Sequence, residues 1–190
     1  MYNVILSMSK LESAELFAKT KHAGMKRKDG VTDYFEHLKS VVNRLQNIGI
    51  TDEDMLCTAW LHETLEDTST TFDELIQRFG KEVAVLVFSL SKDQTIARKQ
   101  KELQYVKQLK DATWQAKIIK LCDIASNLKE LKTSGLSKNK RNKFVRQRRH
   151  YLNAIKNGII ENKSKAQGIQ PVIDAVNEIF VEYRLWPVKL

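Results

Sequence analysis

Apolar residues recur every three or four positions along most of the chain, which is the spacing of one buried face of an α-helix. The first two helices are predicted at residues 11–22 and 34–48. A third is predicted to take Thr51 as its N-cap, because Asp54 follows three residues later in the position of a capping-box acid. This helix runs toward His62, so polar chemistry comes directly after an apolar stretch.

Capping and turn residues divide the rest of the chain. Thr71 and Glu74 form a second capping box, and the helix that they open is predicted to stop at Gly80. Residues 83–90 are almost wholly apolar, and the helical neighbours favour a buried helix over a strand. Further helices are predicted at residues 112–131, 142–156 and 171–183, with a loop at 134–139. Without an internal repeat or a convincing strand pair, the pattern predicts an all-α protein.

The chain has 190 residues, which suits one domain. We expect this domain to span residues 1–190, with a motif-bearing core at about 10–131 and C-terminal helices at about 140–185. Only seven glycines and two prolines interrupt it, which agrees with long helices.

Charge and cysteine content restrict the binding partners and the cellular compartment. The net charge of +9 attracts anions, although it does not distinguish a nucleotide from nucleic acid or a membrane surface. Cys57 and Cys122 lie in apolar, helix-like stretches, so we expect buried free thiols and a cytoplasmic protein. The apolar start at residues 1–10 lacks the basic region and cleavage site of a signal peptide, and no run reaches the roughly 20 residues of a membrane span.

The densest polar motif follows the third predicted helix. His62, Glu63, Glu66 and Asp67 place one imidazole and three carboxylates within six residues. Burying such a group is costly unless the charges meet a cation. His62 and Glu63 offer nitrogen and oxygen ligands, and Glu66 is predicted one helical turn beyond His62 on the same face. The alternative is a solvated helix end with ordinary acids.

Two weaker motifs flank this one. Asp123 lies in a largely apolar helix, and Asn127 follows at i+4 on the same face, which suits a metal ligand next to a substrate-binding amide. A surface aspartate with a neighbouring asparagine is the alternative. His37 follows two aromatic residues and is either a ligand or a hydrogen-bonded core histidine.

In chain order, the three motifs resemble the ligand order of the HD phosphohydrolase superfamily. Within it, the chain is similar to the hydrolase domain of the RelA/SpoT alarmone enzymes and to their small stand-alone relatives, including the metazoan ones. The residues that carry the resemblance are 18–24, 27–30, 34–37, 61–68, 79–84 and 119–123 together with Asn127. The acid pair Glu66-Asp67 is typical of the alarmone branch.

The resemblance implies a single HD-domain helical bundle and a metal-dependent hydrolase. Such an enzyme removes the 3′-pyrophosphate from guanosine tetra- or pentaphosphate and leaves GDP or GTP. One divalent metal, most often Mn2+, would be held by His37, His62, Glu63 and Asp123. Glu66 and Asp67 would position and deprotonate the attacking water or protonate the leaving group. An anionic guanine nucleotide would contact Arg27, Lys28 and Asn127.

The chain departs from the family pattern at several positions. Glu63 replaces the usual aspartate, and its extra methylene moves the carboxylate by roughly 1.5 Å, a shift that matters in a catalytic site. Leu38, Ile124 and Ser126 replace a proline, an arginine and a histidine, and the loop before His37 is one residue longer. Two alternatives therefore stay open: an HD phosphatase for another nucleotide, and a non-catalytic regulatory or RNA-binding protein on the same scaffold.

A basic segment at residues 138–150 carries seven lysines and arginines, with Phe144 and Tyr151 interleaved at helical spacing. It is either a solvated helix face, a device that attracts a charged nucleotide, or an RNA-binding surface. RNA binding ranks last because no aromatic RNA-binding motif accompanies it. The sequence leaves formation of a homo-oligomer open.

Overall fold

The computed structural model describes residues 8–190, and the apolar start of the chain up to Ser7 lies outside this range. The described part is all-α, as expected, and its only β-type pairing is an isolated bridge between Lys26 and Asp33. The helices are α1 Lys10–Lys21, α2 Tyr34–Asn47, α3 Glu53–Leu61, α4 Thr64–Asp67, α5 Phe72–Phe79, α6 Lys81–Leu90, α7 Arg98–Asp111, α8 Trp114–Glu130, α9 Lys138–Glu161 and α10 Ile169–Glu182. Short 3-10 turns follow α8 and α9.

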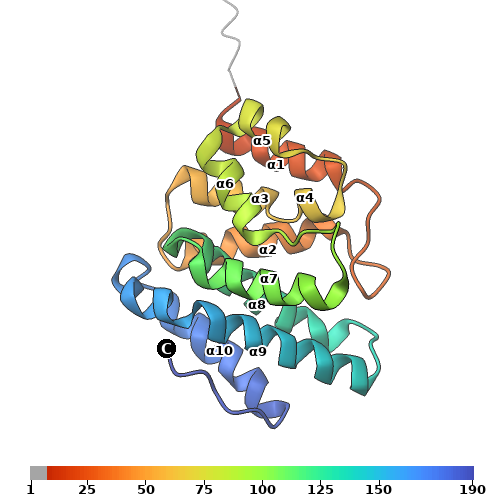
Figure 1. Ribbon diagram of the computed structural model, residues 1–190, viewed down its shortest axis with the longest axis vertical. Coiled ribbons are helices and arrows are strands. Elements are labelled where there is room, and N and C mark those ends of the chain that lie inside the picture. Colours follow the sequence, from red (N-terminus) through yellow and green to blue (C-terminus); the bar gives the residue numbers. More distant parts are fainter. Residues whose placement is uncertain (1–7) are drawn as a thin grey trace, which may run out of the picture.

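Helix α8 lies at the centre of the bundle. It packs against α2, α3 and α6 on one side and against α9 and α10 on the other (Figure 1). Every residue from Ile118 to Leu128 is buried, including the polar Lys120, Asp123, Ser126 and Asn127. Polar groups at this depth need partners, which draws attention to the middle of α8 as a functional position.

Two details at α3 correct the sequence-based expectations. Asp52, not Thr51, is the N-cap, and its carboxylate accepts a hydrogen bond from the Met55 backbone N–H at 2.8 Å. The helix begins one residue later than predicted because the two neighbouring polar residues are both capable caps. Asp54 is not a capping-box partner; it pairs with Lys10 on α1.

The chain does not continue as one helix through the His62 motif. Helix α3 ends at Leu61, His62 is its C-cap, and α4 begins at Thr64. The expectation that Glu66 lies one turn of a continuous helix beyond His62 is therefore wrong. The break turns His62 and Glu63 toward α2 and α8, while Glu66 and Asp67 stand on a separate short helix.

Helix α7 was not predicted from the sequence. It forms from a mostly polar stretch in which only Tyr105 and Leu109, four residues apart, are buried. Helix α9 is longer than predicted because Ser137 caps it, accepting from the Lys140 N–H. Cys57 and Cys122 are buried free thiols, as expected. Among residues 8–190, no helix has the length and apolar content to cross a membrane.

Candidate metal centre and active site

Three separate parts of the fold bring four ligand-type side chains together. His37 comes from α2, His62 and Glu63 from the junction of α3 and α4, and Asp123 from the middle of α8. One nitrogen or oxygen atom of each residue lies within 4.8 Å of the corresponding atoms of the others. This separation is what ligands around a single ion would show, and the four residues are those predicted from the sequence.

The hydrogen bonds of both imidazoles leave Nε2 as the ligand atom. His37 Nδ1 lies 3.0 Å from Glu130 Oε1, and His62 Nδ1 lies 2.8 Å from the Ala59 carbonyl oxygen. Because these acceptors take the Nδ1–H, Nε2 is the nitrogen of each ring that is left to ligate a metal, in place of a proton. Both Nε2 atoms are buried without a hydrogen-bond partner, and they face Asp123 Oδ1 at 3.2 and 3.7 Å. The side chains present therefore fit a divalent cation.

The electrostatics of the cluster favour positive charge between the ligands. Burial raises the pKa of Asp123, but Lys120, His37 and His62 outweigh it and hold that pKa well below its usual range. Burial also opposes ionisation of Glu63, yet His62 lowers its pKa to about 2. Conversely, burial lowers the pKa of His62, while Asp123 and Glu63 together raise it to about 10. Two ionised carboxylates with imidazole nitrogen suit Mn2+, Fe2+ or Zn2+.

The acid pair lies on α4 next to this cluster. Glu66 accepts hydrogen bonds from the Lys92 backbone N–H at 2.8 Å and from the Gln94 side chain at 3.2 Å. Asp67 accepts one from the Tyr34 hydroxyl. Burial, reinforced by the charge of Glu63, raises the pKa of both carboxyl groups. A carboxyl group with a raised pKa can exchange a proton nearer neutral pH, as acid-base catalysis requires.

Hydrogen bonds connect Arg27 to two of the ligand-type residues, to His37 through Glu130 and to Asp123 through Asn127. Its guanidinium donates to Glu130 at 2.7–2.8 Å and to Asn127 Oδ1 at 3.0 Å. Glu130 also holds the ring of His37, and Asn127 Nδ2 donates to Asp123. The loop that carries Arg27 is therefore coupled to the metal ligands by charged hydrogen bonds, which are stronger than neutral ones.

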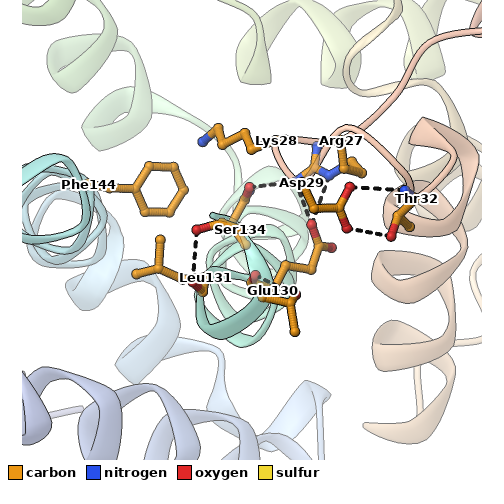
Figure 2. A pocket seen from close by; sticks show the side chains of 10 residues that line it. Arg27, Lys28, Asp29, Thr32, Glu130, Leu131, Ser134 and Phe144 are labelled. Atoms are coloured by element: carbon orange, nitrogen blue, oxygen red, sulfur yellow. Dashed lines mark hydrogen bonds and ion pairs between the residues drawn. The ribbon is translucent and has the colours of Figure 1, made fainter. Parts of the chain in front are cut away.

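A cavity of about 280 Å³ opens over the cluster, which is enough for part of a nucleotide. Both acidic and cationic side chains line this cavity; the lining includes Arg27, Lys28, Glu63, Glu66, Asp67, Lys92, Lys120, Asp123, Asn127 and Arg148. A second pocket continues past Arg27, Lys28 and Asn127. In Figure 2 the loop from Arg27 to Thr32 borders one side of it, and Phe144 and Leu131 border the other.

Sequence reasoning missed several residues of this site. Lys92 and Glu130 were not singled out, Tyr34 and Lys120 stood in the quoted motifs without a role, and Arg148 was noted only as part of the basic segment. Lys120 could have been noticed, because it lies three residues before Asp123 in an apolar helix and forms a 2.8 Å ion pair with it. Lys92 and Arg148 reach the site only through tertiary packing, so no local spacing would have identified them.

The comparisons with known proteins agree with this arrangement. The HD-domain family profile matches residues 14–153. A zebrafish protein named guanosine-3′,5′-bis(diphosphate) 3′-pyrophosphohydrolase MESH1 is 38% identical over 117 residues, which are 60% of this chain and 65% of the relative. The mouse protein of the same name is 40% identical over 123 residues, covering 64% of this chain and 68% of the relative.

Similar solved structures share the fold. One, reported as "A metazoan ortholog of SpoT hydrolyzes ppGpp and plays a role in starvation responses", superimposes with a TM-score of 0.79 at 24% identity, covering 92% of this chain and 95% of the other. A second, from Listeria monocytogenes, gives a TM-score of 0.61 at 22% identity over 78% of this chain and 96% of the other. With the profile matching most of its length, the chain belongs to the HD-domain family.

Proposed function

We propose that this protein is a metal-dependent hydrolase that removes the 3′-pyrophosphate from guanosine tetra- or pentaphosphate and leaves GDP or GTP. The observation that carries the proposal is the pair of buried, unpartnered imidazole Nε2 atoms facing ionised carboxylates beside the acid pair Glu66-Asp67. The relatives named as pyrophosphohydrolases of this nucleotide support the choice of substrate. The aligned region covers about two thirds of those relatives, and the family match at residues 14–153 contains all four proposed ligand residues.

HD-domain hydrolases bind a divalent metal, and this chain has a suitable His/Asp site. Here we propose Mn2+, held by His37, His62, Glu63 and Asp123. When bound, such an ion lowers the pKa of a coordinated water and shields the phosphate charge from the nucleophile.

The chain's own residues supply the proton transfers. Glu66 and Asp67 lie beside the ligand cluster, and their raised pKa values allow them to take a proton from water or to give one to the ribose 3′ oxygen. The Lys92 N–H and Gln94 fix the carboxylate of Glu66, and Tyr34 fixes that of Asp67. A carboxylate that is already held in one orientation loses less conformational freedom in the reaction than a mobile one.

The nucleoside would lie on the other side of the cavity. Arg27 stands 4.9 Å from the Tyr34 ring and borders both pockets together with Lys28 and Asn127. We propose that the ribose contacts Asn127 and that the base enters the second pocket next to Phe144 and Leu131. We also propose that the protein acts on this anionic nucleotide in the cytoplasm.

The test is release of pyrophosphate from guanosine tetraphosphate by purified protein with Mn2+. We expect equal amounts of pyrophosphate and GDP from the wild type. The Glu66→Ala, Asp67→Ala double variant should lose at least about 100-fold in rate, the usual contribution of acid-base groups. Asp73→Ala removes an exposed acid on α5 and serves as the control, which should retain wild-type activity.

Two outcomes would contradict the proposal in different ways. A wild type that binds Mn2+ and leaves this nucleotide intact would redirect the search to other phosphorylated nucleotides. A wild type that neither binds metal nor hydrolyses the nucleotide would favour the non-catalytic alternative, with Glu63 marking a lost site.

A further inference from the structure

Three cations gather on one wall of the cavity, next to Glu66 of the acid pair, whose carboxylate accepts a hydrogen bond from the Lys92 backbone N–H. Lys92, Lys120 and Arg148 come from the loop before α7, from α8 and from α9, and all three line the cavity. They pack on a pair of tyrosines, Tyr105 and Tyr151, whose rings meet edge to face at 5.2 Å. Segments that are far apart in sequence thus bring three positive charges to one place.

The tyrosine pair holds these charges without neutralising them. The ammonium groups of Lys92 and Lys120 lie 5.0–5.6 Å from the two ring centroids, and the Arg148 guanidinium lies 5.7 Å from that of Tyr151. Such cation–π contacts help to desolvate a cation while it keeps its charge. The rings themselves are anchored, because the hydroxyl of Tyr105 donates to the Leu90 carbonyl and that of Tyr151 donates to Glu102.

The acids around this wall are already engaged. Lys120 pairs with Asp123, which is also a proposed metal ligand, and Lys92 lies 3.7 Å from Glu102, which accepts from Tyr151 and Gln147. Arg148 donates from Nη1 to the Gln147 side chain, and its Nε is buried without a hydrogen-bond partner. A buried guanidinium donor without an acceptor is costly unless a ligand supplies one.

We propose that Lys92, Lys120 and Arg148 form the subsite for the pyrophosphate group, both in the substrate and as the released product. The inference rests on the proposed function and adds the orientation of the nucleotide in the cavity. Lys120 links the subsite to the metal ligands through its 2.8 Å contact with Asp123, so a diphosphate there lies between the metal centre and the cations.

All atoms are accounted for when the nucleotide is hydrolysed in this orientation. The oxygen of water bonds to the phosphorus next to the ribose 3′ oxygen, the bond from that phosphorus to the 3′ oxygen breaks, and the 3′ oxygen receives a proton. The diphosphate stays with the cations as pyrophosphate, while the nucleoside part stays on the side of Arg27. The two products therefore separate from different walls of the cavity.

The experiment measures inorganic pyrophosphate and GDP binding to Mn2+-loaded protein by calorimetry, with titration into Mn2+ alone as the blank. Lys92→Met and Arg148→Met remove one charge each while keeping apolar contact with the tyrosines. The Lys92 substitution also keeps the backbone N–H that holds Glu66. Arg146→Met is the matched control, since Arg146 is an exposed cation on the same helix as Arg148.

We expect Lys92→Met and Arg148→Met to weaken pyrophosphate binding by about 10-fold or more, as loss of a charged hydrogen bond does. Lys92→Met should change GDP binding by less than about 2-fold, Arg148→Lys should restore part of the pyrophosphate affinity, and Arg146→Met should resemble the wild type. Unchanged pyrophosphate affinity in both Met variants, even with reduced thermal stability, would overturn the subsite and leave the cations a structural role.

This outcome is separate from that of the proposed function. Pyrophosphate binding that depends on Lys92 and Arg148, in a protein that leaves guanosine tetraphosphate intact, would keep the subsite and reject the nucleotide. Hydrolysis of that nucleotide by a wild type whose Met variants bind pyrophosphate normally would keep the function and reject the subsite.

Discussion

At the residue scale, Glu63 is the position where this chain departs most from an HD motif. Glu63 lies in the break between α3 and α4 and not inside a helix. Its Oε1 still reaches to 3.3 Å from His62 Nε2, within the ligand cluster. The longer side chain therefore still brings its carboxylate into the ligand cluster.

The corresponding prediction concerns metal affinity. Glu63→Gln keeps the size of the side chain but removes its charge, and should weaken Mn2+ binding by about 100-fold, since even the partners of metal ligands are worth 10- to 100-fold. Glu63→Asp restores the usual residue and should stay within about 10-fold of the wild type. Calorimetric titration of metal-depleted protein gives both values, and wild-type affinity in Glu63→Gln would show that Glu63 is not a ligand.

The role of Glu130 became visible only in the structure. This residue holds the Nδ1 side of His37 and the guanidinium of Arg27 at the same time. Glu130→Ala should lower Mn2+ affinity by about 10- to 100-fold and also raise KM for the nucleotide, because both partners lose their orientation. Glu130→Asp should recover part of both, and Lys129→Ala, at an exposed neighbour, should alter neither. A change confined to thermal stability would count against this coupling.

At the scale of elements, the site depends on where helices end. His62 and Glu63 reach the ligand cluster because α3 stops at Leu61, and Asp123 reaches it because α8 crosses the centre of the bundle. Lys92, whose N–H fixes Glu66, lies in the segment just after α6. Helix boundaries were also the features that the sequence pattern located least well, as the start of α3 shows.

The start of α3 gives a matched pair of variants for a stability test. Asp52→Ala removes the cap on the Met55 N–H and should lower the free energy of unfolding by about 1 kcal/mol. Thr51→Ala changes the neighbouring residue, which does not cap the helix, and should cost less than about 0.5 kcal/mol. Urea denaturation of the two variants measures the difference, and the reverse ranking would restore Thr51 as the cap.

At the scale of the whole molecule, the net charge is +9, and seven of the lysines and arginines lie at residues 138–150 of α9. Phe144, Arg148 and Tyr151 of α9 border the two pockets, so the basic first half of this helix adjoins the site. Lys138, Lys140, Lys143 and Arg146 are exposed. Of the three interpretations of the basic segment, attraction of an anionic nucleotide agrees best with this position.

This interpretation predicts a dependence on ionic strength. Raising KCl from 0.05 to 0.5 M, which shortens the screening length to roughly 4 Å, should lower kcat/KM several-fold and change kcat little. Replacing Lys138, Lys140 and Lys143 by glutamine should flatten this dependence. A control that removes the exposed Lys81, Lys99 and Lys107 instead should flatten it less. Equal slopes in the two variants would mean that the basic helix face is only solvated.

The sequence by itself determined the all-α class and most of the helices, because apolar periodicity is a local property of the chain. The resemblance of its motifs to a known family implied the ligand set His37, His62, Glu63 and Asp123, four side chains that the structure brings together. Tertiary structure alone decided which Nε2 atoms face Asp123, that Glu130 links Arg27 to His37, and that Lys92, Lys120 and Arg148 share one wall. The physical reason is distance along the chain: Lys92 and Arg148 come from segments more than fifty residues apart, and only the packing of α7, α8 and α9 around two tyrosines brings their charges together.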